Sequence, residues 1–114
     1  MQKIKYVTIT LPEDVFDVEG ATVVRRKRVS VAEVDRLRNL GKTVKDPKDA
    51  EEELYEGMAK IWPRWDGVVD VDSGELLPNP ETNPFVFARL GITEQLPWFM
   101  GAGLKVRPNG KRRR

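Results

Sequence analysis

Cysteine and histidine are both absent from this sequence of 114 residues. Without cysteine the chain can form no disulfide, no thiolate nucleophile and no thiolate metal site. Without histidine it lacks the commonest general base and the commonest transition-metal ligand. Catalysis would therefore need a recognisable group of carboxylate, lysine, tyrosine or serine side chains.

No such group stands out. Asp70, Asp72 and Glu75 lie close to a glycine, but their spacing does not fit a calcium-binding EF-hand loop and is typical of a turn between short strands. The glycines at 101 and 103 lack the third glycine and the strand-then-helix context of a dinucleotide-binding loop. We therefore expect a protein that binds partners, is not an enzyme, and needs no cofactor or metal.

Long apolar runs are also missing, since no stretch approaches the roughly 18 to 20 residues of a membrane span. The first ten residues, MQKIKYVTIT, are typical of a strand rather than of a signal peptide. The length and the 39% hydrophobic content suit one small domain. We expect a soluble cytoplasmic protein with a single domain over 1–106 and a basic tail over 107–114.

Charge is unevenly distributed along the chain. Residues 1–45 carry 10 basic and 6 acidic side chains, net +4, and residues 82–114 carry 7 basic and 1 acidic, net +6. Between them, residues 46–81 carry 3 basic and 11 acidic side chains, net −8. Such segregation favours electrostatic complementarity, either within one fold or between copies of the chain.

Residues 3–11 and 21–29 are rich in β-branched side chains, with turn-forming residues between them. They predict an N-terminal β-hairpin or small antiparallel sheet. Residues 68–71, VVDV, are a candidate for one further short strand. The rest of the chain is helical in pattern, so the sequence predicts an α+β fold with three to four short helices after the strands.

Four helix starts are indicated. Ser30 and Glu33 form a capping box for a helix over about 31–40, which Gly41 would end. Asp46-Pro47 opens the second helix, Asn83-Pro84 the third and Thr93 the last. The expected apolar faces of the first two helices consist of Val31, Val34 and Leu37, and of Leu54, Met58, Ile61 and Trp62.

Two segments are candidates for partner contact. The basic strand Arg25, Arg26, Lys27, Arg28 alternates, so Arg25 and Lys27 share one face and the other two share the opposite face. One pair should then point to solvent or to a partner. With Arg112 and Arg113 of the tail, this strand is a candidate for contacting nucleic-acid phosphates, or it is simply a solubilising edge.

The second segment is the proline-rich loop from Trp65 to Pro80. Trp65 stands between a basic and an acidic residue, and we expect it to be partly exposed as a contact residue. Leu77, Pro78 and Pro80 must run extended, because residues that precede proline avoid the α region. We expect them to contribute to the same contact surface.

The layout resembles the small tail assembly proteins of long-tailed bacteriophages, the tail assembly chaperones. The resemblance covers roughly residues 20–104 and rests on a tryptophan, an aspartate, a Gly-Glu pair and a Leu-Pro-x-Pro step, here Trp65, Asp70, Gly74-Glu75 and Leu77-Pro78-Asn79-Pro80. It implies binding to the tape-measure protein and recruitment of tail tube subunits in the host cytoplasm, through an apolar groove and by several copies at once.

Two alternatives remain open. The basic ends differ from the acidic composition of many tail assembly chaperones, which argues against a purely transient role. The first alternative is a structural virion protein such as a connector, head-completion or tail component. The second alternative is a small nucleic-acid-binding regulator that uses the basic strand and the tail.

Overall fold

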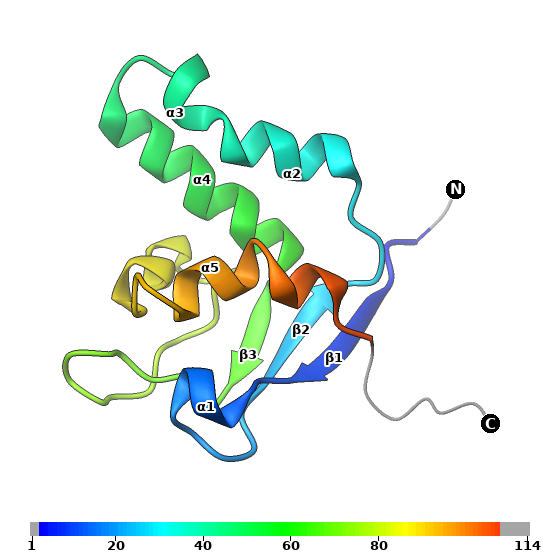
Figure 1. Cartoon of the computed structure of the whole chain (residues 1–114), viewed down its shortest axis with the longest axis vertical. Coiled ribbons are helices and arrows are strands. Elements are labelled where there is room, and N and C mark those ends of the chain that lie inside the picture. Colours follow the sequence, from blue (N-terminus) through cyan, green and yellow to red (C-terminus); the bar gives the residue numbers. More distant parts are fainter. Residues whose placement is uncertain (1–2, 108–114) are drawn as a thin grey trace.

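A three-stranded antiparallel sheet in the order β1-β2-β3 forms the base of the molecule. The structure, a computed structural model, describes residues 3–107. Strand β1 is Tyr6–Thr10, β2 is Thr22–Arg26 and β3 is Arg64–Asp66. Short helices follow the first two strands, and the α+β class with N-terminal strands is confirmed (Figure 1).

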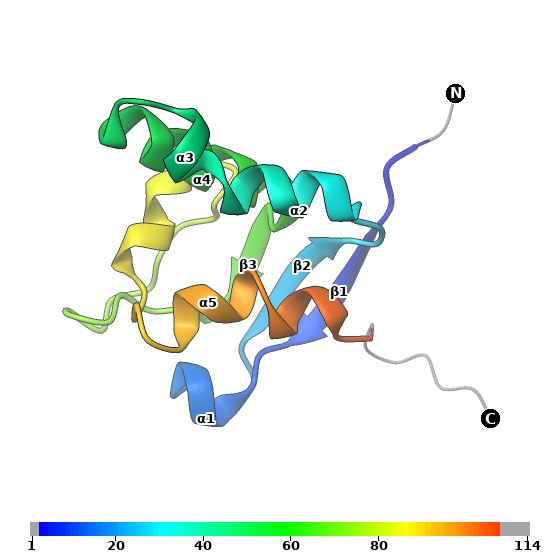
Figure 2. The same ribbon diagram turned by 45° about the horizontal axis from the view of Figure 1, so that its top comes forward.

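Most of the helices lie above the sheet or across one of its faces, and the first lies at the lower end of the strands (Figures 1 and 2). Their bounds, with η marking a 3₁₀ helix, are α1 Glu13–Phe16, α2 Val31–Arg38, α3 Leu40–Thr43, α4 Pro47–Ile61, η1 Pro84–Arg89, α5 Gln95–Phe99 and η2 Ala102–Lys105. In both views α5 and η2 cross in front of the strands. None of the helices within residues 3–107 is long and apolar enough to cross a membrane.

Three of the four expected helix starts are confirmed. The Ser30 hydroxyl accepts a hydrogen bond of 3.1 Å from the backbone N–H of Glu33. The Asp46 carboxylate caps α4 and Pro47 is its first residue, while the Asn83 side chain caps η1 in the same way. These caps form because a side-chain oxygen satisfies a backbone N–H that has no partner inside the helix.

The fourth start is wrong, and so are two details nearby. Helix α5 begins after Glu94 without a side-chain cap, so Thr93 does not start it. Gly41 does not end the first helix, because the chain turns at Asn39 and Gly41 lies inside α3. Val31 was expected on the apolar face of α2, yet it is 76% exposed, whereas Val34 and Leu37 are buried.

The strand predictions need two corrections. Residues 68–71 form no strand, only a bridge between Val69 and Leu76. The third strand is β3 instead, which pairs Trp65 with Val23 of β2. It is three residues long, too short for any pattern of alternation to appear in the sequence.

The core lies on the sheet face that the helices cover. Strand register places Ile9, Val23 and Trp65 side by side, and all three are buried. Trp65 also belongs to a cluster of aromatic rings in this core, most of whose pairs meet edge to face. The cluster consists of Phe16, Trp62, Trp65, Phe87, Trp98 and Phe99. The opposite face, with Tyr6, Val24 and Arg26, is open to solvent or half-buried.

Candidate partner-binding surface

Trp65 is a core residue, and the prediction of partial exposure is wrong. Its side chain is 7% exposed and packs edge-on against Phe87. Its backbone N–H donates to the side-chain oxygen of Asn79 at 3.1 Å, and its indole N–H donates to the carbonyl of Leu77 at 3.4 Å. Trp65 therefore holds the proline-rich loop against the sheet and presents no contact surface.

The remaining loop residues divide between burial and exposure. Pro80 is fully buried, so it cannot contact a partner as expected, whereas Pro78 is exposed. Leu77 is half-buried, and its N–H donates to the carbonyl of Val68. The loop thus stabilises its own fold, because its buried residues pack inward on the same core as Trp65.

The Asp70 side chain organises the turn that follows it. Its carboxylate accepts backbone N–H bonds from Asp72 and Ser73 and pairs with the Arg89 guanidinium at 2.6 Å. The hydrogen bond from Arg89 holds the pKa of Asp70 below its usual value, and the two backbone bonds act in the same direction. Of the residues that carry the resemblance, Trp65, Asp70 and Pro80 are therefore structural, whereas Gly74, Glu75 and Pro78 are exposed.

The four residues of the predicted basic strand, 25–28, differ in burial. Arg25 is 6% exposed and donates to the carbonyls of Gly103 and Val106 at 2.8 and 3.0 Å, so it is a structural residue. Burial lowers the pKa of its guanidinium below the ordinary value. Its expected face-mate, Lys27, is exposed because it lies one residue beyond the end of β2.

Arg26 is also engaged within the fold. Its guanidinium pairs with Glu33 of α2 and donates to the carbonyl of Lys60 at the end of α4. Arg28 is exposed, so Lys27 and Arg28 are the two residues of the predicted basic strand that face solvent freely. Arg112 and Arg113 lie outside the described residues.

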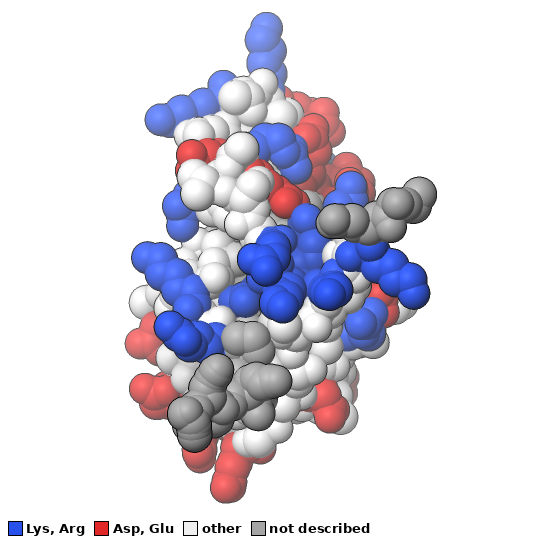
Figure 3. All heavy atoms as spheres, turned by 90° about the vertical axis from the view of Figure 1, so that its right-hand side faces the viewer, with Lys and Arg blue, Asp and Glu red and all other residues white. Residues whose placement is uncertain are grey.

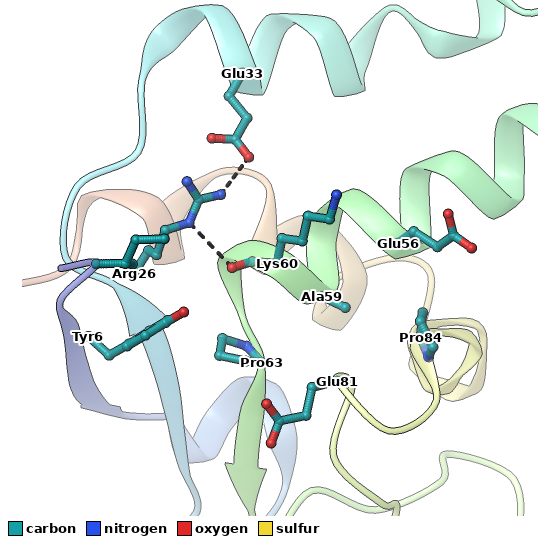
Figure 4. A pocket seen from close by; sticks show the side chains of 10 residues that line it. Tyr6, Arg26, Glu33, Glu56, Ala59, Lys60, Pro63, Glu81 and Pro84 are labelled. Atoms are coloured by element: carbon teal, nitrogen blue, oxygen red, sulfur yellow. Dashed lines mark hydrogen bonds and ion pairs between the residues drawn. The ribbon is translucent and has the colours of Figure 1, made fainter. Parts of the chain in front are cut away.

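An open groove lies on the uncovered side of the sheet (Figure 4). Its volume is about 560 Å³. Its floor comes from β1 and β2, one wall from the last turns of α4 and the other from the segment before η1. The lining residues are Ile4, Tyr6, Arg26, Glu33, Glu56, Ala59, Lys60, Pro63, Glu81 and Pro84.

The groove combines apolar surface with charges of both signs. Ile4 is 64% exposed and Tyr6 43%, and the Arg64 guanidinium lies 5.5 Å from the centre of the Tyr6 ring. Figure 4 shows the Arg26–Glu33 pair above this surface and Glu81 below it. Such a lining suits a segment that is apolar on one side and charged on the other.

Sequence reasoning missed the groove residues Ile4 and Tyr6. Their signal was present, because alternation over 3–11 puts positions 4, 6 and 8 on one strand face. The alternation does not show that α4 ends beside this strand face and leaves it uncovered. The wall residues Pro63 and Pro84 reach the groove through the tertiary fold alone.

Within residues 3–107 no group of three His, Cys, Asp or Glu side chains is arranged to hold a metal ion. Comparison with known proteins adds no relative, since no family model matches the chain and neither a curated protein nor a solved structure matches it significantly.

Proposed function

We propose that this chain is a non-enzymatic tail assembly protein of a bacteriophage, which binds an amphipathic helix of the tape-measure protein in the groove beside β1. The observation that carries the proposal is the groove itself, with Ile4 and Tyr6 exposed at its floor. The resemblance of residues 20–104 to tail assembly chaperones supplies the class of partner. Tube subunits would be recruited to the chaperone once the helix is held.

The energetics favour a weak, reversible contact for each copy. Complete burial of a large apolar side chain contributes roughly 1.5–3 kcal/mol. Ile4 and Tyr6 are already partly buried, so together they would contribute about 2–4 kcal/mol. Micromolar affinity needs about 8 kcal/mol. Copies that also associate with one another on one long partner would supply the remainder through avidity, because the second contact is then intramolecular. Weak contacts of this kind suit a protein that must later leave.

The test is co-expression with the tape-measure protein of the same genome, followed by size-exclusion chromatography of the soluble fraction. The wild-type chain should keep the tape-measure protein soluble and co-elute with it. Ile4→Glu should abolish both effects, because it places a charge on the apolar floor. Ile92→Glu is the matched control, since Ile92 is 79% exposed and lies outside the groove lining.

Equal behaviour of the two variants, or an insoluble tape-measure protein beside the wild-type chain, would contradict the groove proposal. Mass spectrometry of purified virions distinguishes a tail assembly chaperone from the alternative, a structural virion protein. A chaperone should be missing from the mature particle, whereas a connector, head-completion or tail component should be present in stoichiometric amount.

A further inference from the structure

A second surface carries positive charge that no ion pair within residues 3–107 neutralises. Lys and Arg side chains gather on the side of the molecule that faces the viewer in Figure 3. They line two adjoining recesses that share Lys27 and Arg28. We call this surface the basic face, and its cations are Lys3, Lys5, Lys27, Arg28, Arg38 and Lys105.

Elements far apart in sequence build the basic face. The segment before β1, the loop after β2, the end of α2 and η2 each contribute to it. Arg25 lies buried at its base and ties η2 to β2 through Gly103. Arg38 donates to the carbonyl of Met100 and so ties the end of α2 to the segment before η2. The cations therefore stand on a rigid support.

Little negative charge compensates them. Asp35 is the one carboxylate among the residues that line the two recesses. Nearby Arg26, which is neutralised by Glu33, lies where the basic face meets the groove. A concentrated, uncompensated positive field attracts a polyanion.

The composition of the basic face favours nucleic acid over an acidic protein. Four of its six cations are lysines. Lysine is depleted in protein–protein interfaces relative to the rest of the protein surface. Among the described residues no aromatic side chain lines either recess, so the usual anchors of a protein interface are missing there. Lysine and arginine on a rigid surface are the groups that contact phosphates and position a duplex.

We infer that the basic face binds the phosphate backbone of a nucleic-acid duplex without reading its sequence. A duplex fits better than a single strand, because single-strand binding relies on aromatic platforms for the bases, and the recesses contain none. The basic face borders the groove at Ile4 and Arg26, but its six cations lie outside the groove lining, so each proposal can fail alone.

The experiment measures binding of a fluorescein-labelled DNA duplex of random sequence to the full chain by anisotropy, over a series of salt concentrations. Affinity should fall steeply with salt, since each phosphate contact releases counterions. Lys27→Ala/Arg28→Ala should weaken binding and reduce the magnitude of the salt slope by about 2. A second duplex of different sequence should bind equally well.

The matched control is Lys42→Ala/Lys48→Ala, which removes the same charge from exposed positions on α3 and the start of α4, away from the basic face (Figure 1). This control variant should keep the wild-type dependence of affinity on salt concentration. Equal losses in both double variants would overturn the inference, because only net charge would then matter.

Two further measurements test which residues bind the duplex and whether the surface prefers nucleic acid or acidic protein. If Arg112→Ala/Arg113→Ala abolishes binding while Lys27→Ala/Arg28→Ala binds as wild type does, the tail and not the basic face is responsible. If polyglutamate displaces the duplex as effectively as unlabelled duplex does at equal charge, the surface takes acidic protein. Either result overturns the inference, as does affinity that does not change with salt.

Discussion

The guanidinium of Arg25 donates a 2.8 Å hydrogen bond to the carbonyl oxygen of Gly103, 78 residues later in the chain. A second bond from the same nitrogen reaches Val106, and the guanidinium lies 6.0 Å from the centre of the Trp62 ring. One buried cation thus joins β2, η2 and the aromatic core. It also supports the surface that carries Lys27 and Lys105.

Replacing Arg25 should destabilise the whole domain. Arg25→Met keeps an apolar stem of similar length but leaves the carbonyls of Gly103 and Val106 without these donors, at a cost of about 1–3 kcal/mol. Urea unfolding should report this loss. Lys27→Met, two residues away and exposed, should stay within roughly 0.5 kcal/mol of wild type. Equal stability of the two variants would show that the buried bonds contribute nothing.

Two glycine substitutions should have opposite signs. A Cβ at Gly103 would lie 2.7–2.9 Å from three atoms of the rigid Trp98 ring, so Gly103→Ala should destabilise by about 1–3 kcal/mol. A Cβ at Gly41 would meet nothing within 4 Å, and Gly41 lies in α3. Gly41→Ala should therefore stabilise by up to about 1 kcal/mol. Thermal unfolding of both variants measures the difference, and a stabilised Gly103→Ala would contradict the contact with Trp98.

Stability should depend on pH through Asp70. The Arg89 hydrogen bond and the backbone bonds from Asp72 and Ser73 lower its pKa in the folded state from the ordinary value of 3.8. A lowered carboxyl pKa contributes stability that is present above the unfolded pKa and is lost as the pH falls through the folded one. The loss should therefore begin near pH 3.8 and continue below it.

Asp70→Asn is the variant that isolates this effect. It keeps an oxygen for the turn bonds but removes the charge beside Arg89, so its free energy of unfolding should fall less steeply in acid than that of wild type. Asp72→Asn, on the exposed side of the same turn, keeps the Asp70–Arg89 pair and is the variant for comparison. Parallel acid profiles for wild type and Asp70→Asn would argue against the prediction.

The side-chain cap of α2 should contribute measurably to the free energy of unfolding. Ser30→Ala removes the hydroxyl that accepts from the Glu33 N–H, at a cost of about 1 kcal/mol. Ser30→Asp supplies another acceptor at the same place and should stay close to wild type. Chemical unfolding of the two variants distinguishes a lost cap from a general intolerance of substitution at this position.

Local signals predicted the elements that depend on neighbouring residues. The caps at Ser30, Asp46 and Asn83 were visible because each needs only a side-chain oxygen a few residues before an unpaired N–H. The first two strands were visible through their β-branched content. Strand β3 was not, because three residues carry no periodicity and pair only when β2 is already in place.

The candidate contact residues were predicted less well. Trp65 and Pro80 have the chemistry of interface residues, and nothing in the sequence says that a loop folds back over them. Ile4 and Tyr6 were part of a predicted strand but were not singled out. Their exposure depends on where α4 ends relative to the sheet, which is a property of helix packing.

The sequence by itself determined that the chain is α+β, where most helices start, and that Arg25 and Arg26 lie on opposite strand faces. Only the tertiary structure decided which of those faces is covered. Alternation sorts side chains into two sets, but burial of a set depends on segments far along the chain, here η2 over Arg25. The same packing buries Trp65 and leaves Lys27 and Arg28 free to meet a partner.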